Sequence, residues 1–260
     1  EGWALYYELY DQTTSGKTEQ AKIIGYIPMW RKPEGFNYAN DEIYRNITHG
    51  NIAFLMFDES NLGEFEPQAL AAVMAIISDV VNTGHRNGAR ILISIGGAVD
   101  YGFLSLMTQA ANNPSVLDKA VQNVVNFVRS HSLDGVDLDL ECWWDRNGVA
   151  ANDQGGRPKT DGPHPAGLGL TEFAKQLKQA MPSQLISATV FATSWYGNNY
   201  DPKMVEFLDW VAIMTYDFTG SWNGTPVGPH TALQKIRNQE SYIGEQQGEW
   251  LDPKNEHKGI

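Results

Sequence analysis

The chain of 260 residues is 42% hydrophobic and 19% charged, which is typical of a globular protein and not of a disordered chain, a coiled coil or a repeat array. Its 19 Lys and Arg against 31 Asp and Glu give a net charge of -12, which repels nucleic-acid phosphates and anionic membrane surfaces. We therefore expect neither nucleic acid nor a membrane as a partner. The single Cys142 excludes an internal disulfide and a Cys-based metal cage.

Six short runs of β-branched or aromatic residues alternate along the chain with turns and helical patterns. The runs predict strands over residues 23–28, 51–58, 90–96, 135–141, 185–192 and 210–217. Apolar residues at helical spacing predict helices over 68–82, 115–130 and 170–181. This alternation predicts an α/β fold with a parallel sheet, either a (β/α)8 barrel or a doubly wound open sheet. No glycine-rich phosphate loop follows any run, so we favour the barrel.

Acidic residues alternate strictly with aliphatic residues in the fourth predicted strand. Side chains alternate across a strand, so Asp137, Asp139 and Glu141 should share one face at roughly 6 to 7 Å spacing. Like charges so close in a partly desolvated site cannot all ionise, and at least one should keep a proton near neutral pH. A carboxyl group that keeps its proton near neutral pH can act as a general acid. Glu141 stands at the carboxyl end of the strand, where barrel enzymes keep their chemistry.

Two other interpretations of these carboxylates are a calcium loop and a solvated acidic strand. A helix-loop-helix calcium loop has a Gly soon after its third ligand, whereas Cys142, Trp143 and Trp144 follow here. A solvated edge strand would not alternate acids with Val and Leu among buried βα units. We therefore favour a catalytic set of carboxylates and expect no metal and no cofactor.

The stretch 134–141, which reads DGVDLDLE, resembles the DxxDxDxE motif of glycoside hydrolase family 18, the chitinases. Residues 48–54 (THGNIAF), 93–97 (ISIGG) and 214–218 (MTYDF) resemble the second-strand, third-strand and sixth-strand motifs of that family, in the same order. The resemblance spans roughly residues 23–233. It implies a (β/α)8 barrel that hydrolyses β-1,4-linked N-acetylglucosamine polymers with retention.

The resemblance also implies a mechanism in which the substrate's 2-acetamido oxygen attacks the anomeric carbon, so no protein nucleophile is needed. Glu141 would protonate the leaving glycosidic oxygen and later activate water. Asp139 would hold the acetamido N–H, and Asp137 would share a proton with Asp139. Tyr216 would hydrogen-bond the acetamido carbonyl.

Further side chains are expected to bind substrate. The resemblance places Tyr26 and Phe54 at the border of the site and Asp217 against the same sugar as Tyr216, while Met214 shares the strand face of Tyr216. Indoles that follow predicted strand ends could stack on sugar faces, and we expect this of Trp30, Trp143 and Trp222.

Trp144 and Trp195 also follow predicted strand ends, although any of these indoles could instead cap the top of the barrel. We expect Trp210 to lie in the core. The long segment 147–169 suggests a groove wall or lid, with His164 in solvent.

The sequence after residue 217 reads as a loop, a helix near 231–247 and a polar tail, so strands seven and eight are not evident. We expect an incomplete barrel in a C-terminally truncated chain, with residues 1–21 as an N-terminal extension and 22–260 as the catalytic barrel domain. A strand from residues 3–10, or a further chain or domain, could complete the barrel.

The function expected from the resemblance is an endo-acting chitinase whose partner is chitin or a chitooligosaccharide. The alternatives are an endo-β-N-acetylglucosaminidase and a catalytically weak chitin-binding or scaffold subunit. The presence of Glu141 favours an enzyme. A polymeric substrate implies a secreted protein, and the near absence of Cys favours a bacterial source.

Overall fold

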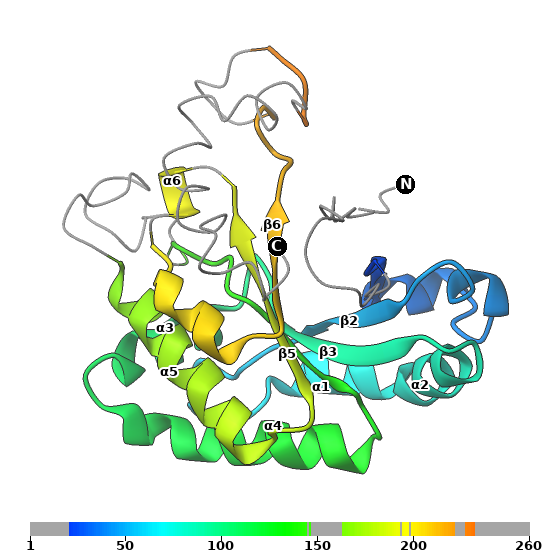
Figure 1. Ribbon diagram of the computed structural model, residues 1–260, viewed down its shortest axis with the longest axis horizontal. Coiled ribbons are helices and arrows are strands. Elements are labelled where there is room, and N and C mark those ends of the chain that lie inside the picture. Colours follow the sequence, from blue (N-terminus) through cyan, green and yellow to red (C-terminus); the bar gives the residue numbers. More distant parts are fainter. Residues whose placement is uncertain are drawn as a thin grey trace, which may run out of the picture.

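The computed structural model describes residues 21–144, 146, 163–192, 194–197, 199–221 and 227–231 (Figure 1). In this part of the chain, six parallel strands form one sheet in the order β1-β2-β3-β4-β5-β6. The strands are β1 Ile24–Pro28, β2 His49–Leu55, β3 Arg90–Gly96, β4 Gly135–Asp139, β5 Leu185–Phe191 and β6 Trp210–Met214. All six predicted strands are therefore confirmed, with boundaries that differ by up to three residues.

Helices connect the strands and lie along the outer side of the curled sheet (Figure 1). The α-helices are α1 Pro67–Met74, α2 Ile77–Arg86, α3 Tyr101–Ala110, α4 Asp118–Ser130, α5 Pro165–Ala180 and α6 Ser194–Gly197. Short 3-10 helices span Met29–Glu34, Asp41–Ile43, Pro114–Leu117 and Pro202–Phe207. None of the helices in the described ranges is long and apolar enough to cross a bilayer.

The outer face of the sheet forms the main hydrophobic core with the helices. Every strand contributes buried aliphatic side chains to it, among them Ile27, Ile52, Ile93, Leu138, Val190 and Ile213. These residues alternate with side chains that point to the inner face, as the period of two requires. The aliphatic half of the sequence pattern thus fixes the helices on one side of the sheet and leaves the other side for the carboxylates.

The inner face is strongly curved. Ile24, Leu92 and Trp210 from β1, β3 and β6 form one buried cluster near the amino ends of the strands, so Trp210 lies in the core as predicted. The Tyr26 hydroxyl on β1 lies 2.8 Å from Asp137 Oδ2 on β4. Neighbouring strands are about 4.8 Å apart, so a contact between the first and fourth strands requires the sheet to curl on itself. The architecture is that of an incomplete (β/α)8 barrel.

Two helix predictions need correction, and one helix was missed. The predicted helix 68–82 is two helices, α1 and α2, and α3 was not predicted at all. Helix α5 begins at Pro165 and not near residue 170, because His164 caps it by accepting a hydrogen bond from the backbone N–H of Ala166 at 3.0 Å. His164 is buried, so its predicted exposure to solvent is wrong.

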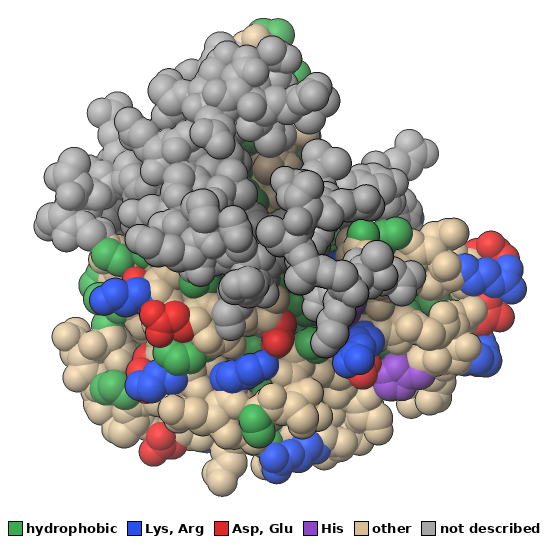
Figure 2. Space-filling model, in the orientation of Figure 1, with side chains coloured by type: hydrophobic (Ala, Val, Ile, Leu, Met, Phe, Trp, Pro, Cys, Tyr) green, Lys and Arg blue, Asp and Glu red, His purple; other side chains and the backbone are tan. Residues whose placement is uncertain are grey.

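The outer edges of β1 and β6 have no paired strand among the described residues. The strand predicted over 3–10 lies outside these residues, as does nearly all of the helix predicted near 231–247. On the face shown in Figure 2, acidic and basic side chains are interspersed over the described part of the surface, with apolar side chains scattered among them. The net negative charge is therefore not gathered into one visible area of that surface.

Candidate active site

The acidic residues of the fourth strand lie on the inner face of the sheet. Asp137 and Asp139 are buried within β4, whose strand pairing ends at Asp139. Glu141 is half-buried and lies two residues beyond the strand, so its predicted place inside the strand is wrong. It lies on the segment that leaves the carboxyl end of β4, which is the end where parallel barrels assemble their sites.

Asp137 is the centre of a buried hydrogen-bond network. Ser94 on β3 and Ser187 on β5 are its partners in the strand register, and their hydroxyls donate to it at 2.8 and 2.6 Å. The Tyr26 hydroxyl donates at 2.8 Å and also lies 2.7 Å from Thr189 Oγ1. Burial raises the pKa of Asp137, while these donors act in the opposite direction.

Asp139 lies above Asp137 on the same face, with fewer polar neighbours. Its Oδ1 atom is buried without a hydrogen-bond partner among the described residues. Burial raises the pKa of Asp139 well above its ordinary value, and the negative charges of Glu141 and Asp137 raise it further. These surroundings therefore disfavour a negative charge on Asp139.

Glu141 is the carboxyl group poised to exchange a proton near neutral pH. Burial raises its pKa to about 7, against a hydrogen bond from Asp139 that lowers it, and the charges of Asp217 and Asp137 add to the increase. A general acid works best when its pKa is close to the operating pH. Glu141 has that property, and its side chain is not fully enclosed.

The segment after β6 carries Tyr216 and Asp217, with Met214 buried at the end of the strand. Asp217 has a left-handed backbone (φ 57°), and its Oδ1 accepts a hydrogen bond from His230 Nε2 at 2.6 Å. The His230 ring also stacks on Tyr216, with centroids 6.0 Å apart. His230 was missed by the sequence reasoning, because nothing in the sequence indicates that the chain returns to this point.

Three aromatic side chains lead from the carboxylates to the surface. The ring of Tyr26 lies 6.4 Å from that of Phe54, which stacks on Trp30 at 6.1 Å. Trp30 is 54% exposed. The structure thus brings these three predicted residues together as one continuous aromatic edge, from Asp137 in the interior to solvent.

Trp143 is the predicted binding residue that the structure places elsewhere. Its side chain is fully buried, with its ring 5.7 Å from His164 and 5.1 Å from Tyr200. It is therefore part of the core and has no surface to offer a sugar, because the chain turns inward after Glu141. Trp144 is half-buried against Tyr196. Trp222 and the side chain of Trp195 lie outside the described residues.

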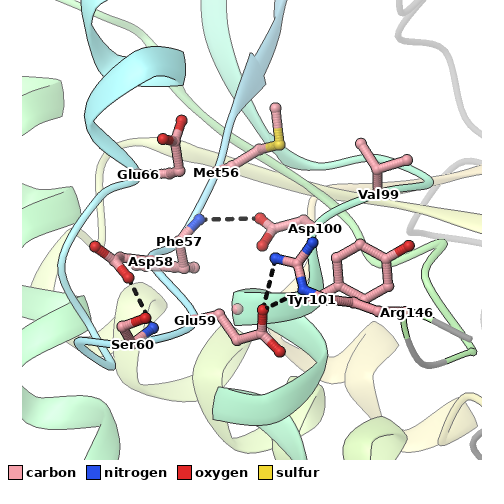
Figure 3. A pocket seen from close by; sticks show the side chains of 11 residues that line it. Met56, Phe57, Asp58, Glu59, Ser60, Glu66, Val99, Asp100, Tyr101 and Arg146 are labelled. Carbon is pink, nitrogen blue, oxygen red and sulfur yellow. Dashed lines mark hydrogen bonds and ion pairs between the residues drawn. The ribbon is translucent and has the colours of Figure 1, made fainter.

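A pocket of about 180 Å³ lies between the segments that follow β2, β3 and β4 (Figure 3). Arg146 forms an ion pair of 2.7 Å with Glu59 and lies over the ring of Tyr101, 4.5 Å from its centroid. At the back of the pocket, Asp100 accepts hydrogen bonds from the backbone N–H groups of Phe57 and Phe103. The pocket lining does not include the β4 carboxylates.

In the described ranges, no His, Cys, Asp and Glu side chains are grouped so as to hold a metal ion.

Comparisons with known proteins identify a family. The model of glycosyl hydrolases family 18 matches residues 22–258. The chain is 26% identical over 213 residues to Probable chitinase 10 of Drosophila melanogaster, which covers 78% of this chain and 9% of that protein. It is 30% identical over 153 residues to Secreted chitinase LysM12 of Penicillium expansum, which covers 56% of this chain and 9% of that protein.

The fold is similar to that of a class V chitinase variant from Nicotiana tobaccum in complex with NAG4. The TM-score is 0.64 at 17% sequence identity, over 88% of this chain and 62% of the other. The chain thus spans about a tenth of the two curated relatives and less than two thirds of this structural neighbour. The family model, however, covers nearly the whole chain and includes the carboxylates of β4. The chain therefore belongs to glycosyl hydrolases family 18.

Proposed function

We propose that the chain is a chitinase that hydrolyses β-1,4-linked N-acetylglucosamine polymers from within the polymer and with retention, by substrate-assisted catalysis. The observation that carries this proposal is the pairing of Glu141 with Asp139. One carboxyl group has a pKa raised to about 7 at the carboxyl end of β4, and the other is buried directly behind it. Such a pair separates the roles of proton carrier and charge stabiliser.

In the first step, Glu141 gives its proton to the leaving glycosidic oxygen. The 2-acetamido oxygen of the same sugar attacks the anomeric carbon as the glycosidic bond breaks, which yields an oxazolinium ion. In the second step, the Glu141 carboxylate takes a proton from water, and the water oxygen opens the ring at the anomeric carbon. Two displacements at one carbon give retention, and Glu141 regains its proton.

Asp139 supports the cationic intermediate. Its unpartnered Oδ1 would accept the acetamido N–H, which both orients the attacking oxygen and satisfies a buried acceptor. Asp137, to which the hydroxyls of Tyr26, Ser94 and Ser187 donate at 2.6 to 2.8 Å, would share a proton with Asp139, as the family resemblance implies. Asp139 would then carry its charge when the cation develops.

The remaining site residues would bind the sugar chain. Tyr216 would donate to the acetamido carbonyl, with Asp217 and Met214 against the same sugar. The aromatic edge of Tyr26, Phe54 and Trp30 would carry sugars further along the groove, because indole and phenyl faces pack on the C–H faces of sugar rings. We include Trp222 on the family resemblance alone.

The comparisons support the substrate class. The named relatives are chitinases, and the structural neighbour is a complex with NAG4. We accordingly propose chitin or a chitooligosaccharide as the ligand, secretion as the route to it, and residues 22–260 as the catalytic domain, after an extension over residues 1–21.

The decisive experiment is Glu141→Gln, assayed on a fluorogenic N-acetylglucosamine oligomer. Removal of the proton donor should lower kcat by about 10²- to 10⁴-fold, while oligomer binding measured by calorimetry stays within a few fold. For the parent chain, proton NMR at early times should show the β-anomer first. Near-normal turnover of the variant, or the α-anomer first, would refute the mechanism.

The parent chain also distinguishes the alternatives. Preferred release of N-glycans from a glycoprotein would identify an endo-β-N-acetylglucosaminidase. Binding of chitin oligomers without any turnover would identify a chitin-binding or scaffold subunit.

A further inference from the structure

Tyr200 connects two segments that meet beside the carboxylates. It lies in the connection between β5 and β6, and its side chain is buried. Its hydroxyl donates a hydrogen bond to the backbone carbonyl of Leu140 at 2.7 Å. Its ring meets that of Trp143 at 90°, with centroids 5.1 Å apart. One side chain therefore contacts the chain on both sides of Glu141.

The backbone at this point needs such a contact, because the strand pairing has ended. The register between β4 and β5 stops at Leu138. On the β3 side, the carbonyl of Asp139 accepts from the backbone N–H of Gly97 at 2.8 Å. On the β5 side, the next carbonyl, that of Leu140, is bound by Tyr200. Two successive carbonyls are thus fixed from opposite sides, immediately before Glu141.

Building on the proposed function, we propose that Tyr200 is a positioning residue for Glu141. Its hydrogen bond to Leu140 and its packing on Trp143 hold the peptide units on either side of the acid and keep its carboxyl aimed at the inner face of the sheet. Nothing in the proposed reaction requires Tyr200 to touch the substrate.

Tyr200 is itself anchored independently of Glu141. The carbonyl of Asn199, the preceding residue, accepts a hydrogen bond from the backbone N–H of His164 at 3.1 Å, just before α5. The carboxylate of Asp201, the following residue, accepts one from Thr171 on α5 at 3.0 Å. Tyr200 thus connects the backbone beside Glu141 to α5, a helix packed in the main core.

The hydroxyl of Tyr200 keeps its proton over the working pH range, and with it the hydrogen bond to Leu140. Burial raises its pKa well above the ordinary value, and the negative charges of Asp139 and Glu141 raise it further. Asp137 and Asp217 are the other carboxylates whose charge acts on Glu141. The hydrogen bond from Tyr200 to Leu140 therefore does not change when Glu141 gains or loses its proton.

The test compares Tyr200→Phe with the matched variant Tyr44→Phe. Tyr44 is also fully buried and donates to a backbone carbonyl, that of Tyr38, at 2.7 Å, but it lies in the connection between β1 and β2. Each variant loses one buried hydroxyl and one hydrogen bond to a carbonyl. The two should therefore lose similar amounts of thermal stability.

Only Tyr200→Phe should change the chemistry. Its kcat on a soluble N-acetylglucosamine oligomer should fall about tenfold, since small displacements of a catalytic group are costly, with KM within about twofold. The alkaline limb of its pH profile should move to lower pH, because water that reaches a loosened Glu141 favours the charged carboxylate. Tyr44→Phe should keep the parental kcat and pH profile. Parental kinetics in Tyr200→Phe, or equal losses of kcat in both variants, would overturn the proposal.

A second measurement does not depend on turnover. Carboxyl-carbon NMR can follow the titration of Glu141 in the parent and in both variants, with Glu141→Gln to assign the signal. The midpoint should move to lower pH in Tyr200→Phe alone, and an unchanged midpoint would contradict the positioning role. If the parent chain does not hydrolyse the oligomer at all, the proposed function fails while this titration still decides the role of Tyr200.

Discussion

Asp139 and Glu141 are two residues apart, yet they are solvated differently. Asp139 is enclosed at the end of β4, whereas Glu141 is only half-buried on the segment beyond it. A group that must exchange protons with water needs that access, and a group that must stabilise a cation gains from its exclusion. The turn of the chain after Asp139 thus gives each carboxyl group the surroundings that its proposed role requires.

The substitution Asp139→Asn tests the second role. An amide keeps the shape of the side chain but carries no charge, so it cannot stabilise the developing cation as a carboxylate does. We expect kcat on a chitin oligomer to fall by at least about 10²-fold, with little change in KM. A variant that retained the parental kcat would exclude participation of the acetamido group oriented by Asp139.

The period of two in the sequence was sufficient to place Asp137 and Asp139 on one face, since that alternation is a property of any strand. It could not identify Ser94 and Ser187 as partners of Asp137, because their proximity depends on the register between strands. It also could not show that Trp143 points inward, because two successive indoles after a strand end give no indication of which way the chain turns.

Among the elements, α3 was missed although its signals are present. Asp100 caps it by accepting from Phe103 N–H, and the buried Phe103, Leu106, Met107 and Ala110 follow at helical spacing. The opposite error joined α1 to α2, because the buried positions continue in helical spacing from Val73 through Ile76 and Ile77 across the break.

Asp100 is expected to stabilise two elements together. Besides capping α3, its Oδ2 accepts from the backbone N–H of Phe57 in the segment after β2 at 3.0 Å. Asp100→Ala removes a cap and leaves a buried N–H unsatisfied, so the free energy of unfolding should fall by about 2 to 4 kcal/mol. Urea denaturation measures this.

Asn40→Ala provides the comparison for Asp100→Ala. Asn40 caps the short helix Asp41–Ile43 through a single exposed hydrogen bond to Glu42 N–H at 3.1 Å. Loss of this cap should lower the free energy of unfolding by less than about 1 kcal/mol. Equal losses in the two variants would show that the link from Asp100 to Phe57 contributes nothing.

For the molecule as a whole, buried carboxyl groups set the pH dependence of stability. Burial raises the pKa values of Asp137 and Asp139, and those of Asp100 and Glu141 to about 7. A carboxyl with a higher pKa in the folded state stabilises the fold while protonated, and this contribution is lost as pH rises through the folded value. The contributions of Asp100 and Glu141 should therefore be lost between about pH 4.5 and 7.5, and the free energy of unfolding should fall over that range.

Urea titrations at pH 5, 6, 7 and 8 measure how the free energy of unfolding changes with pH. In Asp139→Asn the free energy of unfolding should depend less on pH, because one buried group no longer ionises. For the same reason this variant should unfold at a higher urea concentration than the parent at pH 8. Stability that increases steadily from pH 5 to pH 8 in the parent would contradict the raised pKa values.

The parallel sheet, its strand order and its outer helices follow from short-range patterns, so the sequence predicted them well. The curl of the sheet is different, since it depends on how β1 meets β4 and β5. The sequence indicated the curl only indirectly, through the missing phosphate loop, which favoured a barrel, and through the family resemblance. The family resemblance also indicated Tyr216 and Asp217, but not their grouping with His230, which depends on the path of a loop.

The hydroxyl of Tyr26 bridges Asp137 and Thr189, which lie 111 and 163 residues further along the chain. Contacts of such sequence separation form late, because closing long loops costs entropy before any interaction is gained. The donors around Asp137 are therefore complete only after β5 has joined a sheet that already holds β1. A partly folded chain that has its helices and its first strands still lacks an organised set of carboxylates, so the hydrolytic activity that we propose would be among the last properties that this molecule acquires as it folds.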